Sequence, residues 1–220
     1  MTTRLSAAIV VTALLAALLS VVATGPAEAR TRCTKVAVIG DSKSERRIGA
    51  REVIAEQLNR RGMPSFLSTS SGRTVHRAGF GTDKRHGSGI AAVGHAKRAG
   101  ANCFVIALGG NDAMRARGDR RVLRQSIEAL MSAVGREHTV DWVTSTSGHL
   151  TGRWSRHTLH QFTIELDRAR ARWPNLEVNH WERVPEYLPL WWRPDLLHYH
   201  TGNTERGRYT VDSAFLRGSR

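Results

Sequence analysis

Short apolar runs and amphipathic stretches alternate along the chain. Apolar runs of strand length predict five strands, at residues 35–39, 65–68, 102–108, 139–144 and 176–179. Between and after them, apolar residues recur at helical spacing, which predicts helices at residues 45–61, 88–99, 119–134, 155–172 and 205–216. Residues 69–87 are rich in Ser, Gly, Thr and Arg and are expected to form a long loop.

Two of the predicted helices begin at residues that favour helix N-caps, Asp119 and Ser155. The first is expected to bury one side, formed by Val122, Leu123, Ser126, Ile127, Leu130 and Val134. The second carries an apolar side formed by Leu159, Phe162, Leu166 and Ala169. Strands that alternate with helices in this way are typical of a single α/β domain, a parallel sheet with helices on both faces.

The first 29 residues have the pattern of a secretory signal peptide. Arg4 precedes an apolar run at residues 7–23, Pro26 follows it, and residues 27–29 (Ala-Glu-Ala) form a small-x-small cleavage site. We therefore expect a signal peptide at residues 1–29, a folded domain at residues 30–220, and a secreted or extracytoplasmic location. The alternative is an uncleaved membrane anchor. No second apolar run of that length follows, so no membrane span is expected after cleavage.

Cys33 and Cys103 are the only cysteines, too few for a disulfide-dense scaffold or a four-cysteine zinc site. Cys33 lies seven residues before Gly40, and Cys103 lies six residues before Gly109. If both precede neighbouring parallel strands, the two sulfurs lie close enough to bridge in an oxidising compartment. Such a bridge would stabilise the fold by about 4 kcal/mol. The alternative is a pair of buried free thiols.

Lys and Arg number 33 against 19 Asp and Glu, which gives a formal net charge of +14. Only four of the basic residues are Lys, a bias that a GC-rich genome produces without selection for a partner. The functional interpretation is attraction to an anionic polymer such as the cell envelope carries. The arginines are scattered along the sequence, so the sequence does not single out a binding face.

Candidate chemistry lies where predicted strands end, because ligand sites in parallel sheets lie beyond the carboxyl ends of strands. Four polar motifs follow strands: Gly40-Asp41-Ser42, Ser71-Gly72-Arg73-Thr74, Gly109-Gly110-Asn111-Asp112 and Asp195-Leu196-Leu197-His198. Together they supply the groups that acyl transfer needs. Ser42 is the candidate nucleophile, His198 its base, and Asp195 the carboxylate that orients the base. The backbone N–H groups of Ser42 and Gly72 and the Asn111 amide are candidate oxyanion donors.

Each motif has a simpler interpretation. The Ser42 motif can be a plain capped turn between a strand and a helix, and Asn111 and Asp112 can cap a turn. His198 and His200 with Asp195 have a spacing compatible with metal ligands, and His200 is an alternative base. The segment from Asp83 to His86 is a second Asp-x-x-His motif, in the loop before the second predicted helix. Further side chains lie beside the motifs in sequence. Lys43, Arg73 and Arg77 can border the cleft and favour an anionic substrate, or they can form a solvated rim. Trp191 and Trp192 can stack on a sugar or an acyl chain, or they can pack the final loop onto the body of the protein.

These residues, in this order, resemble the SGNH or GDSL-type hydrolases over essentially the whole of residues 30–220. The four motif residues fall on Ser42, Gly72, Asn111 and His198, with Asp195 completing the triad. Lys43 stands where the family's namesake motif has leucine. The resemblance implies a flavodoxin-like, three-layer α/β/α fold with a five-stranded parallel sheet. It also implies cleavage or transfer of ester-linked acyl groups, with no metal and no cofactor.

The expected function is therefore that of a secreted serine esterase acting on a small-molecule or polysaccharide ester. A transferase that moves an acyl group onto an envelope polysaccharide with the same triad is the main alternative. A third hypothesis is a non-catalytic binder of anionic polymer. The expected partners are the ester substrate and, by charge, the anionic cell envelope. A monomer without specific nucleic-acid binding is expected.

Overall fold

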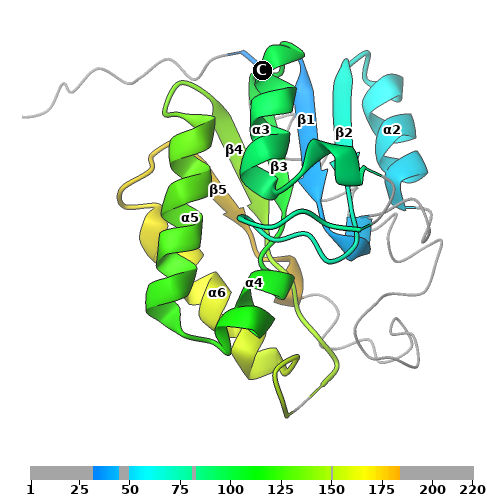
Figure 1. The fold of residues 1–220 in the computed structure, drawn as a ribbon. Helices are drawn as coiled ribbons and strands as arrows, with labels where there is room; N and C mark the ends of the chain where they lie inside the picture. Colours follow the sequence, from blue (N-terminus) through cyan, green and yellow to red (C-terminus); the bar gives the residue numbers. More distant parts are fainter. Residues whose placement is uncertain (1–31, 45–49, 81–82, 150, 184–220) are drawn as a thin grey trace, which may run out of the picture.

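Five parallel strands form one sheet in the order β2-β1-β3-β4-β5 (Figure 1). The structure is a computed structural model that describes residues 32–44, 50–80, 83–149 and 151–183. The strands are β1 (Val36–Gly40), β2 (Ser65–Thr69), β3 (Cys103–Ala107), β4 (Thr139–Val143) and β5 (Leu176–Asn179). The predicted flavodoxin-like α/β/α fold is confirmed. The predicted signal peptide and the predicted helix at residues 205–216 lie outside the described residues.

The helices follow the predicted alternation with strands. They are α2 (Ala50–Arg60), α3 (Gly89–Arg98), α4 (Gly110–Ala116), α5 (Arg120–Val134) and α6 (Arg156–Ala169), with 3₁₀ turns η1 (Ser42–Ser44), η3 (Lys84–His86) and η4 (Trp181–Arg183). Both predicted N-caps are confirmed: Asp119 accepts from the Arg121 and Val122 N–H groups, and Ser155 accepts from the Thr158 N–H. The short α4 was not predicted, because Gly-Asn-Asp at its start is typical of a turn.

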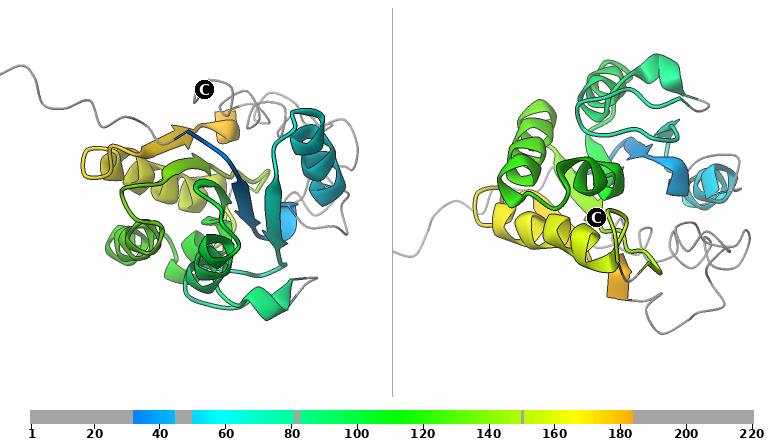
Figure 2. Two further views of the ribbon diagram at one scale, coloured as in Figure 1. Left: turned by 90° about the horizontal axis from the view of Figure 1, so that it is seen from above. Right: turned by 60° about the horizontal axis from the view of Figure 1, so that its bottom comes forward.

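Helices cover both faces of the sheet (Figure 2). On one face α3, α5 and α6 pack on side chains such as Phe104, Ile106 and Trp142. On the other face α2 packs its Ile54 and Leu58 toward β1 and β3. The apolar side predicted for α5 is buried, with one exception. Val122 is 39% exposed, because a residue next to Leu123 in sequence points about 100° away from it around the helix.

A disulfide joins Cys33 to Cys103, as predicted. Cys103 begins β3 and is paired in register with Val36 of β1, three positions after Cys33. The parallel register therefore brings the two Cα atoms to 5.6 Å from each other. The bridge closes the end of the β1–β3 pair that is opposite the carboxyl edge. Among the described residues, no helix is long and apolar enough to span a membrane.

Candidate active site

The candidate nucleophile lies on a tight turn directly after β1. Gly40 ends the strand, and a Cβ there would lie 2.6 Å from the Ser44 Cβ, so the turn needs glycine at this position. Asp41, Lys43 and Ser44 are buried, whereas Ser42 keeps partial solvent exposure. The turn therefore presents Ser42 at the carboxyl edge of the sheet while burying its neighbours.

The Asp41 carboxylate holds this turn and connects it to the end of β3. Its Oδ1 accepts the Lys43 N–H at 3.0 Å, and its Oδ2 accepts from Asn111 Nδ2 at 3.3 Å. The same Nδ2 donates to the Arg73 carbonyl at 3.1 Å. One amide thus joins the motifs that follow β1, β2 and β3. Ser42, Gly72 and Asn111 belong to these three motifs, and the structure brings the motifs together as predicted.

Neither Asn111 nor Asp112 acts as a cap for its own helix. The N-cap of α4 is Gly109, with no side-chain cap bond, and Asn111 reaches Asp41 and Arg73 instead. Asp112 accepts the Val75 N–H at 3.0 Å through Oδ1. The side chains of this motif therefore do more than cap a turn. Both side chains bind the loop that follows β2.

Gly72 occupies a position that only glycine fits. Its φ is +72°, and a Cβ there would lie 2.3 Å from the Cε1 atom of Phe80. The Phe80 N–H donates to the Ser71 carbonyl at 2.9 Å, which fixes the loop over Gly72. The Gly72 N–H has no acceptor among the described residues. A backbone donor without a protein acceptor is what an oxyanion site requires.

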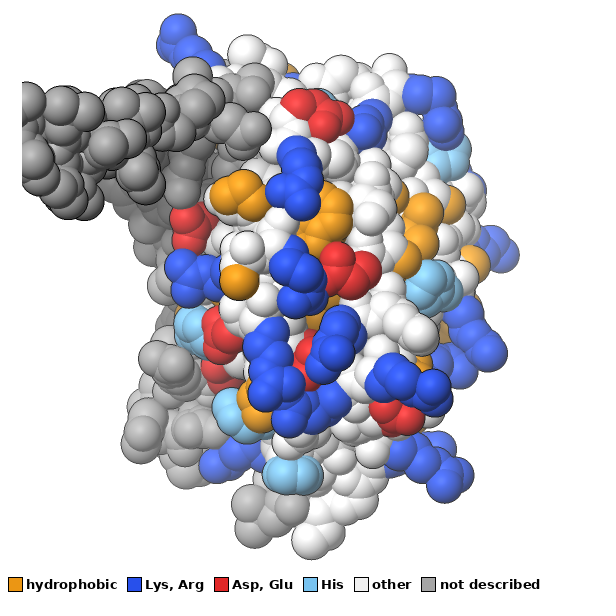
Figure 3. Space-filling view, turned by 90° about the vertical axis from the view of Figure 1, so that its left-hand side faces the viewer, with side chains coloured by type: hydrophobic (Ala, Val, Ile, Leu, Met, Phe, Trp, Pro, Cys, Tyr) orange, Lys and Arg blue, Asp and Glu red, His pale blue; other side chains and the backbone are white. Residues whose placement is uncertain are grey.

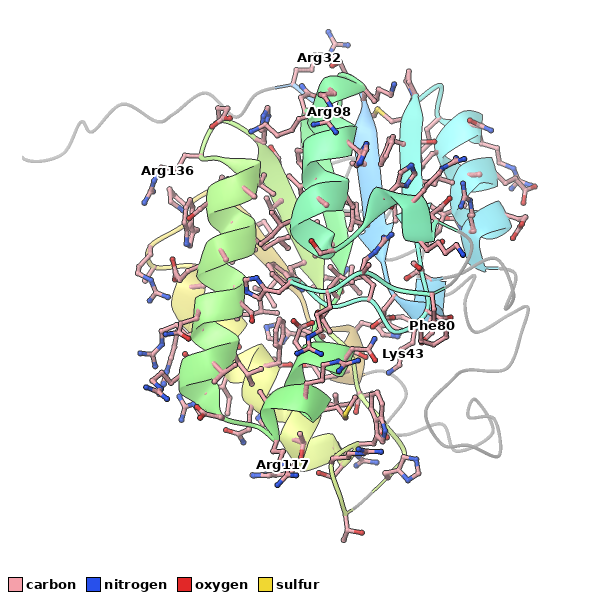
Figure 4. All side chains as sticks on the ribbon, in the orientation of Figure 1. Arg32, Lys43, Phe80, Arg98, Arg117 and Arg136 are labelled. Atoms are coloured by element: carbon pink, nitrogen blue, oxygen red, sulfur yellow. A yellow bond between two sulfur atoms is a disulfide. The ribbon has the colours of Figure 1, made fainter. Side chains whose placement is uncertain are left out.

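Arg73 and Lys43 are not on a solvated rim, and neither borders an open cleft with its charge. Arg73 is fully buried: its Nη1 donates to the Ser68 carbonyl at 2.7 Å and its Nη2 to the Asp83 carbonyl at 3.0 Å. Lys43 is 4% exposed, and its Nζ donates to Ser145 Oγ at 2.6 Å and to the Thr146 carbonyl at 2.5 Å. Lys43, labelled in Figure 4, joins the turn after β1 to the loop after β4. Arg73 joins the end of β2 to the loop that follows it. Arg77, by contrast, is exposed.

Asp112 is a buried carboxyl to which the sequence motif assigned no role beyond capping a turn. Burial raises its pKa to about 7; the Val75 N–H opposes that rise and the neighbouring Asp41 charge adds to it. Its Oδ2 atom is buried without a hydrogen-bond partner among the described residues. The signal that marks Asp112 is this burial, which depends on the fold and is not visible in the sequence.

The second Asp-x-x-His motif does not form a catalytic pair. Asp83 accepts from the Thr69 N–H at 3.2 Å and pairs with Arg51. His86 shares a 2.9 Å hydrogen bond between its Nδ1 and Ser68 Oγ, and burial lowers its pKa. These partners give Asp83 and His86 structural roles beside β2.

Asp195, His198 and the alternative base His200 lie outside the described residues, as do Trp191 and Trp192. The triad therefore stays a prediction at these positions. Within the described part of the chain, no group of three or more His, Cys, Asp or Glu side chains is arranged to hold a metal ion.

The arrangement of strands and helices is that of known acyl-transfer enzymes. A lipase/acylhydrolase from Enterococcus faecalis superposes with a TM-score of 0.65 at 16% identity, over 84% of this chain and 95% of that one. The C-terminal catalytic domain of Streptococcus pneumoniae peptidoglycan O-acetyltransferase A gives 0.60 at 14% identity, over 84% and 91%. The chain has the fold of the SGNH hydrolases. A Clostridium thermocellum family 3 carbohydrate esterase gives 0.59 at 12% identity, over 84% and 98%.

These likenesses, all below 25% identity, show the fold and not the reaction. No protein-family model and no curated protein sequence matches this chain. The function has to be argued from the site.

Proposed function

We propose that the protein is a serine ester hydrolase that removes acyl groups from a carbohydrate or lipid ester through an acyl-enzyme on Ser42. The observation that carries the proposal is the Asn111 amide, which binds Asp41 beside Ser42 although 70 residues separate the two in sequence. A turn or a capped helix has no need for this contact. An oxyanion site uses hydrogen-bond donors held beside the nucleophile, and a side-chain amide is one such donor.

The chemistry follows from the positions of the donors. The Ser42 Oγ attacks the ester carbonyl and passes its proton to a base, which we assign to His198 oriented by Asp195. The N–H groups of Ser42 and Gly72 and the Asn111 amide stabilise the oxyanion. The base then protonates the leaving alcohol, and water hydrolyses the acyl-enzyme. For this, Asn111 gives up its long 3.3 Å bond to Asp41, while its 3.1 Å bond to the Arg73 carbonyl holds the amide in place.

The proposal is tested by labelling and turnover. Ser42→Ala should abolish reaction with a fluorophosphonate probe and lower kcat for aryl esters by roughly 10⁴–10⁶-fold. Ser44→Ala, a change two residues away at a buried serine of the same turn, is the matched control and should keep both. Labelling that survives the Ser42 change would refute the assignment.

The base is tested in the same assay. His198→Ala should remove nearly all turnover, whereas His86→Ala should keep most of it, because His86 is bound to Ser68 beside β2. An inactive His86 variant with an active His198 variant would contradict the triad. If the parent protein and all variants fold but none of them hydrolyses an ester, the result would favour a non-catalytic binder.

A transferase is the second candidate, and one likeness favours it: the peptidoglycan O-acetyltransferase domain superposes as well as most of the esterases do. The two reactions share the acyl-enzyme and differ in whether water or a sugar hydroxyl accepts the acyl group. Incubation with a labelled acetyl ester and a glycan acceptor separates them. Labelled glycan identifies a transferase, and labelled acetate alone identifies a hydrolase. Export through a signal peptide cut near Ala29 is part of the proposal.

A further inference from the structure

Positive side chains gather on the flank of the molecule formed by α5 and α6 (Figure 3). Three of them share one carboxylate, that of Glu165. Arg120 and Arg124 of α5 donate to it through Nε at 2.7 and 2.9 Å, and Arg168 of α6 donates through Nη1 at 3.0 Å. We refer to these four residues as the arginine cluster.

The arginine cluster carries more positive charge than Glu165 can balance. Three guanidinium groups bind the single carboxylate of Glu165. Glu128, whose charge also acts on Arg124, is already paired with Arg172, so two positive charges stay in excess. Glu165 is fully buried, whereas the side chains of Arg120, Arg124 and Arg168 are 35%, 49% and 52% exposed. A second cation would suffice to saturate both carboxylate oxygens. The third adds repulsion that an external anion would relieve.

The bonds to Glu165 also leave donors pointing elsewhere. Among the described residues, Arg124 contacts Glu165 through Nε alone, so its two Nη groups have no protein acceptor. Arg168 uses only Nη1. Because the carboxylate already restricts these side chains, an incoming oxyanion orders them at a reduced entropic cost. Guanidinium groups presented in this way match phosphate oxygens.

We propose that the arginine cluster binds the phosphate groups of a linear, base-free polymer, such as a polyol phosphate. Nucleic acid fits less well, because base recognition uses aromatic side chains as stacking surfaces. The only large hydrophobic side chains strongly exposed in the described part of the chain are Phe80 and Val122. Phe80 lies in the loop after β2, so α5 and α6 offer no exposed Phe, Tyr or Trp ring, and the exposed rings of α6 are the imidazoles of His157 and His160. A lipid surface fits less well for the same reason, since Val122 alone is available for insertion.

The test measures binding of the full chain to a fluorescent poly(glycerol phosphate) oligomer at several salt concentrations. The Arg124→Gln/Arg168→Gln double variant removes the two excess charges and leaves Arg120 to pair with Glu165. Affinity should fall roughly tenfold or more, with a shallower salt dependence.

The control, Arg60→Gln/Arg98→Gln on α2 and α3, lowers the net charge equally (14 − 2 = 12). It should change affinity less than about twofold. Thermal unfolding checks that both variants fold.

Four results would overturn the proposal. The first is no binding of the oligomer by the parent protein, and the second is equal loss in the control variant, which would assign binding to net charge. The third is single-stranded DNA of equal phosphate number binding as tightly and with the same loss on substitution, which would assign the surface to nucleic acid. Inorganic phosphate at matched concentration should compete poorly. Full competition would reduce the site to one for free phosphate and would contradict binding of a polymer.

Discussion

Asp112 and Glu165 are both carboxyl groups with almost no solvent exposure, 6% and 0%, yet their pKa values are shifted in opposite directions. At the carboxyl edge of the sheet, Asp112 accepts the Val75 N–H and faces Asp41, and burial raises its pKa to about 7. On the α5–α6 flank, burial also acts to raise the pKa of Glu165, but the hydrogen bonds and charges of Arg124 and Arg120 lower it below its usual value.

The difference shows what each region is built for. On the flank, three arginines compensate the buried charge of Glu165 at the junction of two helices. At the edge, the hydrogen bonds that Asp112 and Asp41 accept come from backbone N–H groups and the Asn111 amide, and the more distant charge of Arg115 only partly offsets the effect of burial on Asp112. Arg73, although buried nearby, donates its described bonds to carbonyl groups and to the Ser68 hydroxyl. Incomplete compensation is typical of catalytic sites, where groups are arranged for the reaction at some cost in stability.

The largest expected effect falls on the edge. Asn111→Ala should lower kcat by roughly 10²–10³-fold with little change in KM, because the amide would act on charge that forms only in the transition state. Asn102→Ala is the control. Asn102 also links two segments, since its Oδ1 accepts the Thr34 and Lys35 N–H groups, but it does so at the opposite end of the strands. A change in KM alone at Asn111 would make it a substrate-binding or structural residue.

Much of this edge could be predicted from the sequence. The meeting of the motifs that contain Ser42, Gly72 and Asn111 could be predicted, because a parallel sheet brings its carboxyl ends together whatever the side-chain details. Their catalytic roles stay a prediction. The disulfide followed from the same register. The burial of Lys43 and Arg73 could not be predicted, since a charged residue is buried only when the fold supplies its acceptors.

The α5–α6 flank could be predicted less completely. The apolar sides of both helices were visible in the sequence, but the convergence of Arg120, Arg124 and Arg168 on Glu165 was not. Arg120 and Arg124 precede Glu165 by 45 and 41 positions and lie on another helix, whereas Arg168 lies one turn after Glu165 on the same helix. Whether all three reach Glu165 depends on how the two helices cross. The sequence therefore predicts a net positive charge but not the surface on which the charge is concentrated.

The second effect concerns stability at the edge as a function of pH. Because the pKa of Asp112 is about 7 rather than 3.8, the folded state binds more protons than the unfolded state between roughly pH 4 and 7. The free energy of unfolding should fall as pH rises through this window. Asp112→Asn keeps an acceptor for the Val75 N–H and removes the charge. At about 1.4 kcal/mol per pKa unit, the variant should be more stable than the parent at pH 8 by up to about 4 kcal/mol.

Urea denaturation at pH 4 and pH 8 checks this prediction. The two proteins should have similar stability at the lower pH and diverge at the higher one. Asp119→Asn is the control, because Asp119 is an exposed N-cap and asparagine caps a helix equally well. A constant difference between parent and Asp112 variant at both values would mean that the Asp112 charge is compensated by a group on the protein.

The smallest effect is expected on the flank. Glu165→Gln keeps the shape of the side chain and removes the charge that holds Arg120, Arg124 and Arg168. The three guanidinium groups are partly exposed and can turn to water, so the free energy of unfolding should fall by about 1–2 kcal/mol and not by the 3–5 kcal/mol typical of a stranded buried charge.

This difference in stability between the parent and the Glu165 variant should shrink at high salt, which screens the repulsion among the arginines. It should also shrink as the pH falls through the pKa of Glu165, which the hydrogen bonds and charges of Arg124 and Arg120 hold below its usual value, because the stabilising ionisation is lost there. Glu56→Gln, in an exposed pair with Arg60 one turn away, should cost no more than about 0.5 kcal/mol. If Glu165→Gln left stability unchanged at low salt, the carboxylate would not be holding the two helices together. The contrast with Asp112 would then rest on the exposure of the arginines and not on their number.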